Sequence, residues 1–349
     1  MKQITETIRR IRPLDQEAVE AAERHLDRLT KPPGSLGRLE EIAKQAAGIT
    51  GETIPDLTRK AVLVMAGDHG VCEEGISAFP AEVTPQMVMN FLQGGAAVNV
   101  LARQAGADVI CVDMGVNAEL AHPGLVSRKV RYGTGNIAKG PAMTRQEAEA
   151  AVLAGIALVE EFAAEGCRVF ATGEMGIGNT TPSAALAVAL AGLDAEEAVG
   201  RGTGIDEARR LHKVGVVRRA IEANAPDALD PLGVLAKLGG LEIAGLAGVI
   251  LGAAACRCLV VIDGFISTAA ALVAVRLAPE SAGFLVASHL SQEKGHAALL
   301  EALRLKPVIQ LDMRLGEGTG AVLAFHFIDA ALNVMKEMAT FESAGVSRG

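Results

Sequence analysis

Apolar positions recur at two different spacings, which divide the chain into a helical beginning and an alternating remainder. Near the start they recur at helical intervals from about Asp15 to Leu29 and again from Leu36 to Ile49. Between these segments, the paired prolines of Lys31-Pro32-Pro33-Gly34-Ser35-Leu36-Gly37 exclude a helix and predict a turn. From residue 60, short β-branched runs alternate with longer Ala-rich amphipathic stretches, which is typical of a mostly parallel sheet with crossover helices.

The alternating part predicts a series of strands and long helices. The predicted strands are Ala61 to Met65, Val109 to Asp113, Arg168 to Thr172, Leu259 to Ile262, Phe284 to Ala287 and Val308 to Leu311. The predicted helices are Pro85 to Gln104, Arg145 to Glu165, Pro182 to Leu190, Asp206 to Asn224 and Gly320 to Met338. These elements predict an α/β unit over residues 60–334. The helical segment 1–59 and the C-terminal tail 335–349 are the candidates for a second, smaller domain.

Composition narrows the class of protein. Apolar residues make up 50% of the 349 positions and aromatic residues only 3%, so the core consists of Ala, Val, Leu and Ile. A chain of this length buries enough surface to fold without disulfides or metals, and disordered or fibrous classes are excluded. The five cysteines are scattered through apolar segments, which predicts buried thiols in a cytoplasmic protein.

Charge and hydropathy exclude two kinds of partner. The formal net charge is −8 and no run of five basic residues occurs, so a nucleic-acid partner is not expected. The longest uncharged apolar stretch, Ile243 to Cys256, has 14 residues and is too short to span a membrane. The N-terminus lacks an apolar run, so the sequence predicts no signal peptide.

An acid or a histidine follows every predicted strand, in most cases beside glycine. Parallel sheets bind ligands outside the carboxyl ends of their strands. The alternative interpretation is that the glycines end strands and the acids cap the next helices. Recurrence of the pattern in six loops favours a binding site. The loops contain Gly67-Asp68-His69-Gly70, Asp113-Met114-Gly115, Gly173-Glu174-Met175-Gly176, Asp263-Gly264, Ser288-His289 and Gly316-Glu317-Gly318.

Two glycine-rich loops are typical of an anion site. The segment 173–181 leads into a helix at Pro182, and Arg201-Gly202-Thr203-Gly204 precedes a second helix, which contains Lys213. Such turns direct backbone N–H groups and the positive end of a helix dipole toward a ligand. Neither loop matches a P-loop or a dinucleotide fingerprint, so a monophosphate is the simplest ligand.

Glu317 is the strongest candidate for a catalytic group. It stands between Gly316 and Gly318, and a third glycine follows at Gly320. Glycines let the backbone approach a substrate closely and leave one carboxylate projecting. The alternative interpretation is an acid near the start of the following helix, stabilised by the helix dipole.

Metal ligation has weaker support. Cys256 and Cys258 are separated by one residue and have no second pair, so we interpret them as structural. Asp68 and His69 are a candidate ligand pair, but His69 is equally plausible as a hydrogen-bonding group. The sequence therefore predicts no metal site.

Five motifs occur together in one enzyme family. They are Lys31 to Gly37, GDHGV at 67–71, GEMGIGNTTP at 173–182, VGRGTGID at 199–206 and RLGEGTGA at 314–321. In content and order they resemble the nicotinate-nucleotide–dimethylbenzimidazole phosphoribosyltransferases over essentially the whole chain. The resemblance implies a Rossmann-like α/β domain with helices on both faces of the sheet, a small helical domain, a homodimer, and no cofactor or obligatory metal.

The resemblance also implies the reaction. Nicotinate mononucleotide would donate its 5-phosphoribosyl group to 5,6-dimethylbenzimidazole, giving α-ribazole 5′-phosphate and nicotinate for cobalamin nucleotide-loop assembly. Glu317 corresponds to the catalytic carboxylate of the family, and we expect it to act as general base in a displacement that inverts C1′.

The resemblance and the anion-site argument together predict the remaining site residues. These two arguments place the phosphate at Gly176, Lys213 and the backbone around Ser291. Glu174 is a second acid, which would hold ribose hydroxyls or share the role of base. The residues expected around the aromatic base are Phe79, Met87, Met175 and Leu315, with Gln86 as a polar contact.

The sequence leaves two other functions open. One is a non-catalytic nucleotide- or azole-binding protein with the same fold, although binding alone does not require a carboxylate at Glu317. The other is a nucleotide glycohydrolase, in which water replaces the azole.

Overall fold

A six-stranded parallel sheet forms the centre of the protein. The computed structural model describes residues 2–202 and 204–347, so Thr203 of the second glycine-rich loop lies outside the described residues. The strand order is β3-β2-β1-β4-β5-β6, and every pairing is parallel. The strands are β1 (Lys60–Gly67), β2 (Ala107–Gly115), β3 (Val126–Ser127), β4 (Val169–Met175), β5 (Leu259–Ile262) and β6 (Leu285–Ala287).

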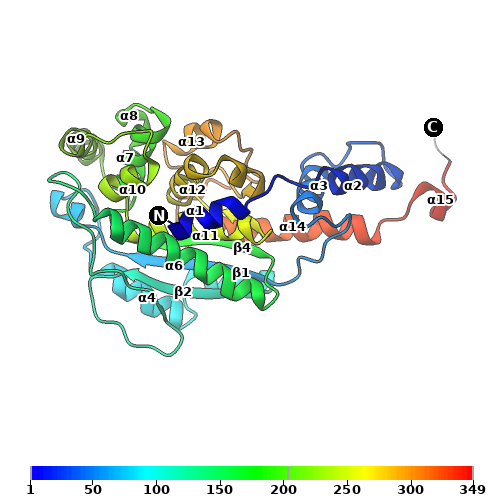
Figure 1. Ribbon diagram of the computed structural model, residues 1–349, viewed down its shortest axis with the longest axis horizontal. Coiled ribbons are helices and arrows are strands. Elements are labelled where there is room, and N and C mark those ends of the chain that lie inside the picture. The colour runs from blue at the N-terminus through cyan, green and yellow to red at the C-terminus, as the bar shows by residue number, and fades with distance from the viewer. Residues whose placement is uncertain (1, 203, 348–349) are drawn as a thin grey trace.

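Helices cover both faces of this sheet (Figure 1). One face packs against α11, with α6 behind it and α12 beside it, and the other packs against α4, α5 and α14. The longer helices are α1 (Lys2–Arg10), α2 (Gln16–Arg28), α3 (Arg38–Thr50), α4 (Val83–Leu92), α5 (Ala97–Ala105), α6 (Arg145–Ala164), α7 (Thr180–Ala191), α9 (Glu207–Asn224), α10 (Pro231–Leu238), α11 (Leu241–Ala255), α12 (Phe265–Leu277), α13 (His296–Ala302) and α14 (Thr319–Glu337). The short ones are η1 (Gly70–Glu74), α8 (Ala195–Ala198), η2 (Pro279–Phe284) and α15 (Phe341–Ala344). The predicted α/β class is confirmed.

Three details of the prediction are wrong. The predicted strand Val308 to Leu311 hydrogen-bonds beside residues 287–290 but forms only one isolated bridge, between His289 and Ile309, because the neighbouring chain leaves the regular sheet where β6 ends at Ala287. The strand β3 was missed because two residues are too few to show a pattern. The predicted helix Pro85 to Gln104 is two helices, α4 and α5, because the Gly94-Gly95 pair interrupts it and Gly94 has φ +76°.

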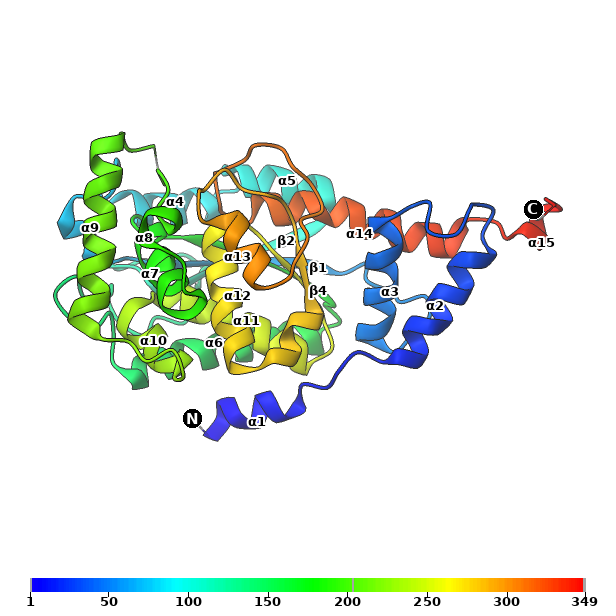
Figure 2. The ribbon, with the colours of Figure 1, turned by 90° about the horizontal axis from the view of Figure 1, so that it is seen from above.

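Helices α2 and α3 and the C-terminal tail meet at one end of the molecule (Figures 1 and 2). There α3 packs against α2 and α14, and a bridge joins Leu29 to Thr340. The predicted turn at 31–37 separates α2 from α3. Helix α1 packs elsewhere, against α6 and α11. The boundaries of a separate small domain, residues 1–59 with 335–349, stay a prediction.

The apolar stretch that ends at Cys256 is a helix of the core. Helix α11 is buried along its length except for Ala255, and it packs most extensively against α6. Among the described residues, no helix is both long and apolar enough to cross a membrane.

Glycines let the backbones of α6 and α11 touch. A Cβ at Gly155 would lie 2.0 Å from the carbonyl oxygen of Gly245. We therefore expect Gly155→Ala to lower the free energy of unfolding by about 1–3 kcal/mol, since overpacking forces the helices apart. Gly215→Ala on α9 is the matched control, because its Cβ would meet only the end of the Arg219 side chain at 3.9 Å. Urea unfolding of both variants tests this, and equal stability would contradict it.

Candidate active site

A cavity of about 460 Å³ lies beyond the carboxyl ends of the central strands. The strand order reverses between β1 and β4, and ligands of open α/β sheets bind where such a reversal leaves a crevice. The loops after β4, β5 and β6 line the cavity together with segments 76–87 and 314–317. The cavity thus brings together four of the six strand-end loops, those after predicted strands three to six.

Nine predicted site residues line this cavity: Phe79, Met87, Glu174, Met175, Gly176, Lys213, Ser291, Leu315 and Glu317. Phe79 and Leu315 are 52% and 57% exposed, so they stand at the mouth. Gln86 is not among the lining residues. Its side chain is exposed on α4, and its contact with a base stays a prediction.

One side of the cavity has the features of an anion site. Lys213 is almost fully buried, and its Nζ donates a hydrogen bond to Oγ1 of Thr180. Burial lowers the pKa of the Lys213 ammonium to about 8, while the nearby Glu293 carboxylate acts in the opposite direction. Thr180 is the first residue of α7, so the N-terminus of this helix faces the same space. A lysine and a helix N-terminus together favour a phosphate.

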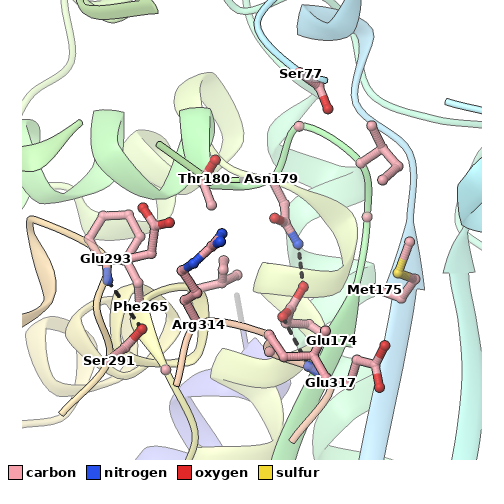
Figure 3. Close-up of a pocket in the computed structure, with 18 of the residues that line it drawn as sticks. Ser77, Glu174, Met175, Asn179, Thr180, Phe265, Ser291, Glu293, Arg314 and Glu317 are labelled. Carbon is pink, nitrogen blue, oxygen red and sulfur yellow. Dashed lines mark hydrogen bonds between the residues drawn. The ribbon is translucent and has the colours of Figure 1, made fainter. Parts of the chain in front are cut away.

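Two carboxyl groups stand on the opposite side, at the end of β4 and before α14. Glu174 accepts hydrogen bonds from the Asn179 amide and, at 3.4 Å, from the backbone N–H of Glu317 (Figure 3). Burial raises the pKa of Glu174 to about 8, and the charges of Asp263 and Glu242 add to this shift. Glu174 is therefore mostly protonated at neutral pH.

The Glu317 side chain points away from Glu174 (Figure 3). Burial raises the pKa of Glu317 to about 6, although a hydrogen bond from the Val98 backbone acts in the opposite direction. Its Oε2 atom is buried and has no hydrogen-bond partner among the described residues. A carboxylate with this pKa and a free oxygen is suited to accept a proton near neutral pH.

Asp263 holds the loop that presents Glu317. The backbone is left-handed at Gly316, Glu317 and Gly318, with φ of +85°, +65° and +91°. The buried carboxylate of Asp263 accepts hydrogen bonds from the N–H groups of Gly318 at 3.1 Å and Ala321 at 3.0 Å. Asp263 thereby caps α14. Glu317 stands just before the N-cap residue Gly318 and outside the first turn, so the acid that bonds the start of this helix is Asp263.

Gly320 completes the same arrangement. A Cβ there would lie 2.0 Å from Nδ1 of His289, so only glycine lets the imidazole pack against the first turn of α14. Nδ1 of His289 is 3.8 Å from the Asp263 carboxylate.

Sequence reasoning missed several residues of this site. Asn179, Asp263, Glu293 and Arg314 were not assigned roles, and Figure 3 shows the Arg314 side chain between the two sides of the cavity. Each of them lies in a loop that follows a strand or in one of the five motifs, so position was the available signal. His69 proves to be a hydrogen-bonding group, since its Nε2 lies 2.7 Å from the buried Glu242 carboxylate. No cluster of three or more potential metal ligands occurs among the described residues.

Comparison with known proteins agrees with this geometry. The fold and the site define an α/β enzyme for an anionic substrate. A family model described as Phosphoribosyltransferase matches residues 11–346. A nicotinate-nucleotide–dimethylbenzimidazole phosphoribosyltransferase from Chloroflexus aggregans is 58% identical over 348 residues, 99% of each chain. One from Desulforamulus reducens is 57% identical over 351 residues, 100% of each chain.

A solved structure extends the match to three dimensions. The crystal structure of CobT from Thermus thermophilus has a TM-score of 0.92 at 50% identity and covers 95% of this chain and 100% of its own. The chain therefore belongs to the nicotinate-nucleotide–dimethylbenzimidazole phosphoribosyltransferase family. The resemblance seen in the five motifs is confirmed.

Proposed function

We propose that this protein transfers the 5-phosphoribosyl group of nicotinate mononucleotide to 5,6-dimethylbenzimidazole for cobalamin synthesis. The observation that supports this best is the pairing of Glu317, with its unpartnered buried oxygen, and Lys213 beside the start of α7 in one cavity. A phosphoribosyl group has its anion at one end and its reacting carbon at the other. The names of the relatives agree with this assignment.

The proposed chemistry is one displacement at C1′. The bond from C1′ to the nicotinate nitrogen breaks, and that nitrogen takes the electron pair and becomes neutral. The unprotonated nitrogen of the incoming base forms the new bond from the opposite face, so the β-nucleotide gives an α-product. The proton on the other base nitrogen passes to Oε2 of Glu317, a step worth about 10²- to 10⁴-fold in rate. Holding both partners on opposite sides of the ribose contributes much of the remainder.

Glu174 has a different role in this proposal. With a pKa of about 8 it is mostly protonated at neutral pH, so it is a poor base and a good hydrogen-bond donor. We place it against the ribose hydroxyls. Phe79, Met87, Met175 and Leu315 would form the apolar slot for the base. The homodimer, the cytoplasmic location and the independence from metals and cofactors stay predictions.

Product analysis tests the proposed reaction. Purified protein would be incubated with nicotinate mononucleotide, with and without 5,6-dimethylbenzimidazole, and the products identified by mass spectrometry. We expect α-ribazole 5′-phosphate and nicotinate in equal amounts, and only when the base is present. Nicotinate released without a coupled product would identify a glycohydrolase. Binding without turnover would identify a binding protein.

The pH dependence of kcat follows from Glu317. Its deprotonated form is the base, so activity is present above its raised pKa of about 6 and is lost as the pH falls through that value. We expect kcat, measured with both substrates saturating, to fall tenfold per pH unit on the acid side. The Glu317→Gln variant is the control, and its residual rate should not show this fall on the acid side. An identical acid limb in the variant would assign the titration to another group.

A further inference from the structure

His296 lies outside the cavity, yet it bonds the loop that reaches the phosphate side. Its side chain is fully buried at the start of α13. Nδ1 is 2.9 Å from the backbone nitrogen of Ser291, and Nε2 is 2.9 Å from Oγ1 of Thr268. The imidazole thus joins the Ser291 loop to α12.

The directions of these hydrogen bonds determine the tautomer of His296. A backbone N–H can only donate, so Nδ1 must be an acceptor without a proton. The Thr268 hydroxyl donates to the carbonyl of Gly264 at 2.8 Å, so its oxygen accepts the hydrogen on Nε2. Burial lowers the pKa of His296 to about 3, and the nearby His289 adds to the shift, so the ring is neutral.

The hydrogen bond to His296 affects how Ser291 presents its hydroxyl group. Its Oγ accepts a hydrogen bond from the backbone N–H of Glu293 at 3.3 Å. Its own hydroxyl proton has no acceptor among the described residues, and the residue lines the cavity. That proton is free to be donated to a ligand oxygen, and the position of its donor depends on the bond from Ser291 N–H to His296.

We propose that His296, as its neutral Nε2–H tautomer, is the positioning residue that aims the Ser291 hydroxyl at the 5′-phosphate of the substrate. This rests on the proposed function only in the choice of phosphate as the ligand. His296 does not touch the substrate. It acts through Ser291, and the line of bonds continues through Thr268 to Gly264, which also lines the cavity.

Two conservative variants separate this role from a merely structural one. In His296→Asn, the side-chain oxygen takes the place of Nδ1 and still accepts from Ser291. In His296→Gln, the amide takes the place of Nε2, so the bond to Thr268 stays and the bond to Ser291 is lost. Each variant thus retains one bond and loses the other, which makes each the control for its partner.

The readout is the Kd of nicotinate mononucleotide by calorimetry, beside the Kd of nicotinate riboside, which lacks the phosphate. We expect His296→Gln to weaken binding of the mononucleotide by about 10- to 100-fold, the range for a lost charge-assisted hydrogen bond. We expect His296→Asn to stay within threefold of wild type, and riboside affinity to stay within threefold in both. Adding Ser291→Ala to the Gln variant should cause no further loss.

Equal losses in the Asn and Gln variants, or equal losses for riboside and mononucleotide, would overturn the proposal. If His296→Gln does not fold, Ser291→Ala removes the hydroxyl that His296 is proposed to aim; the same selective loss for the mononucleotide is expected from it, and an unchanged Kd would overturn the proposal. Binding does not require turnover. A wild-type protein that binds the mononucleotide without transferring it would therefore contradict the proposed function and leave this test intact.

Discussion

Glu317→Gln should lower kcat for transfer to 5,6-dimethylbenzimidazole by at least a hundredfold. The amide has nearly the shape of the carboxylate but cannot take the proton of the attacking base, so the general-base contribution of about 10²- to 10⁴-fold is lost. The change leaves the rest of the loop in place, because the Glu317 backbone and not its side chain bonds Glu174. Rates of α-ribazole phosphate formation, with KM for each substrate, measure the effect.

Glu174→Gln is the matched control, since it changes a second buried carboxyl group on the same side of the cavity. Glu174 is mostly protonated at neutral pH, so an amide replaces it with little loss of charge. We expect its kcat to exceed that of Glu317→Gln by at least tenfold. Equal losses in the two variants would contradict the assignment of a single base.

Asp263→Asn is expected to have the second largest effect, a fall in kcat of about a hundredfold. An asparagine can accept one of the two N–H groups that Asp263 bonds, but its amide would face the other as a second donor. The Gly318 end of the loop would then move, and a shift of about 1 Å in a reacting group can cost about a hundredfold in rate. Affinity for the mononucleotide should change little, since Lys213 lies on the other side of the cavity.

Asp312→Asn is the matched control for this substitution. Asp312 belongs to the same segment but is exposed, and its carboxylate bonds the side chain of Gln292 at 2.7 Å. We expect a kcat within threefold of wild type. A full-rate Asp263→Asn enzyme would show that the loop keeps its conformation without the aspartate.

Local pattern was enough to predict most of the fold. The first five predicted strands all occur, because short apolar runs rich in Val, Ile and Leu, bounded by glycine and polar residues, are typical of buried strands. The turn at 31–37 and the long helices α6, α9 and α14 also occur as predicted. The prediction failed where a neighbour decides the outcome. Val308 to Leu311 has a strand pattern, but only one bridge forms, because the chain beside it leaves the regular sheet after β6.

For the site, the sequence by itself determined the loops and their chemistry, since the first turn after a strand must lie at the edge of the sheet. It placed Glu317 among its glycines and Lys213 two turns into its helix. Only the tertiary structure decided which residues hold these groups. Asp263 bonds Gly318 across 55 positions and His296 is tied to Thr268 across 28. Such pairs carry no local signature, because their geometry arises only when distant strands and helices pack. The same packing removes water from Glu174 and Glu317 and so sets their pKa values, which composition and spacing cannot reveal.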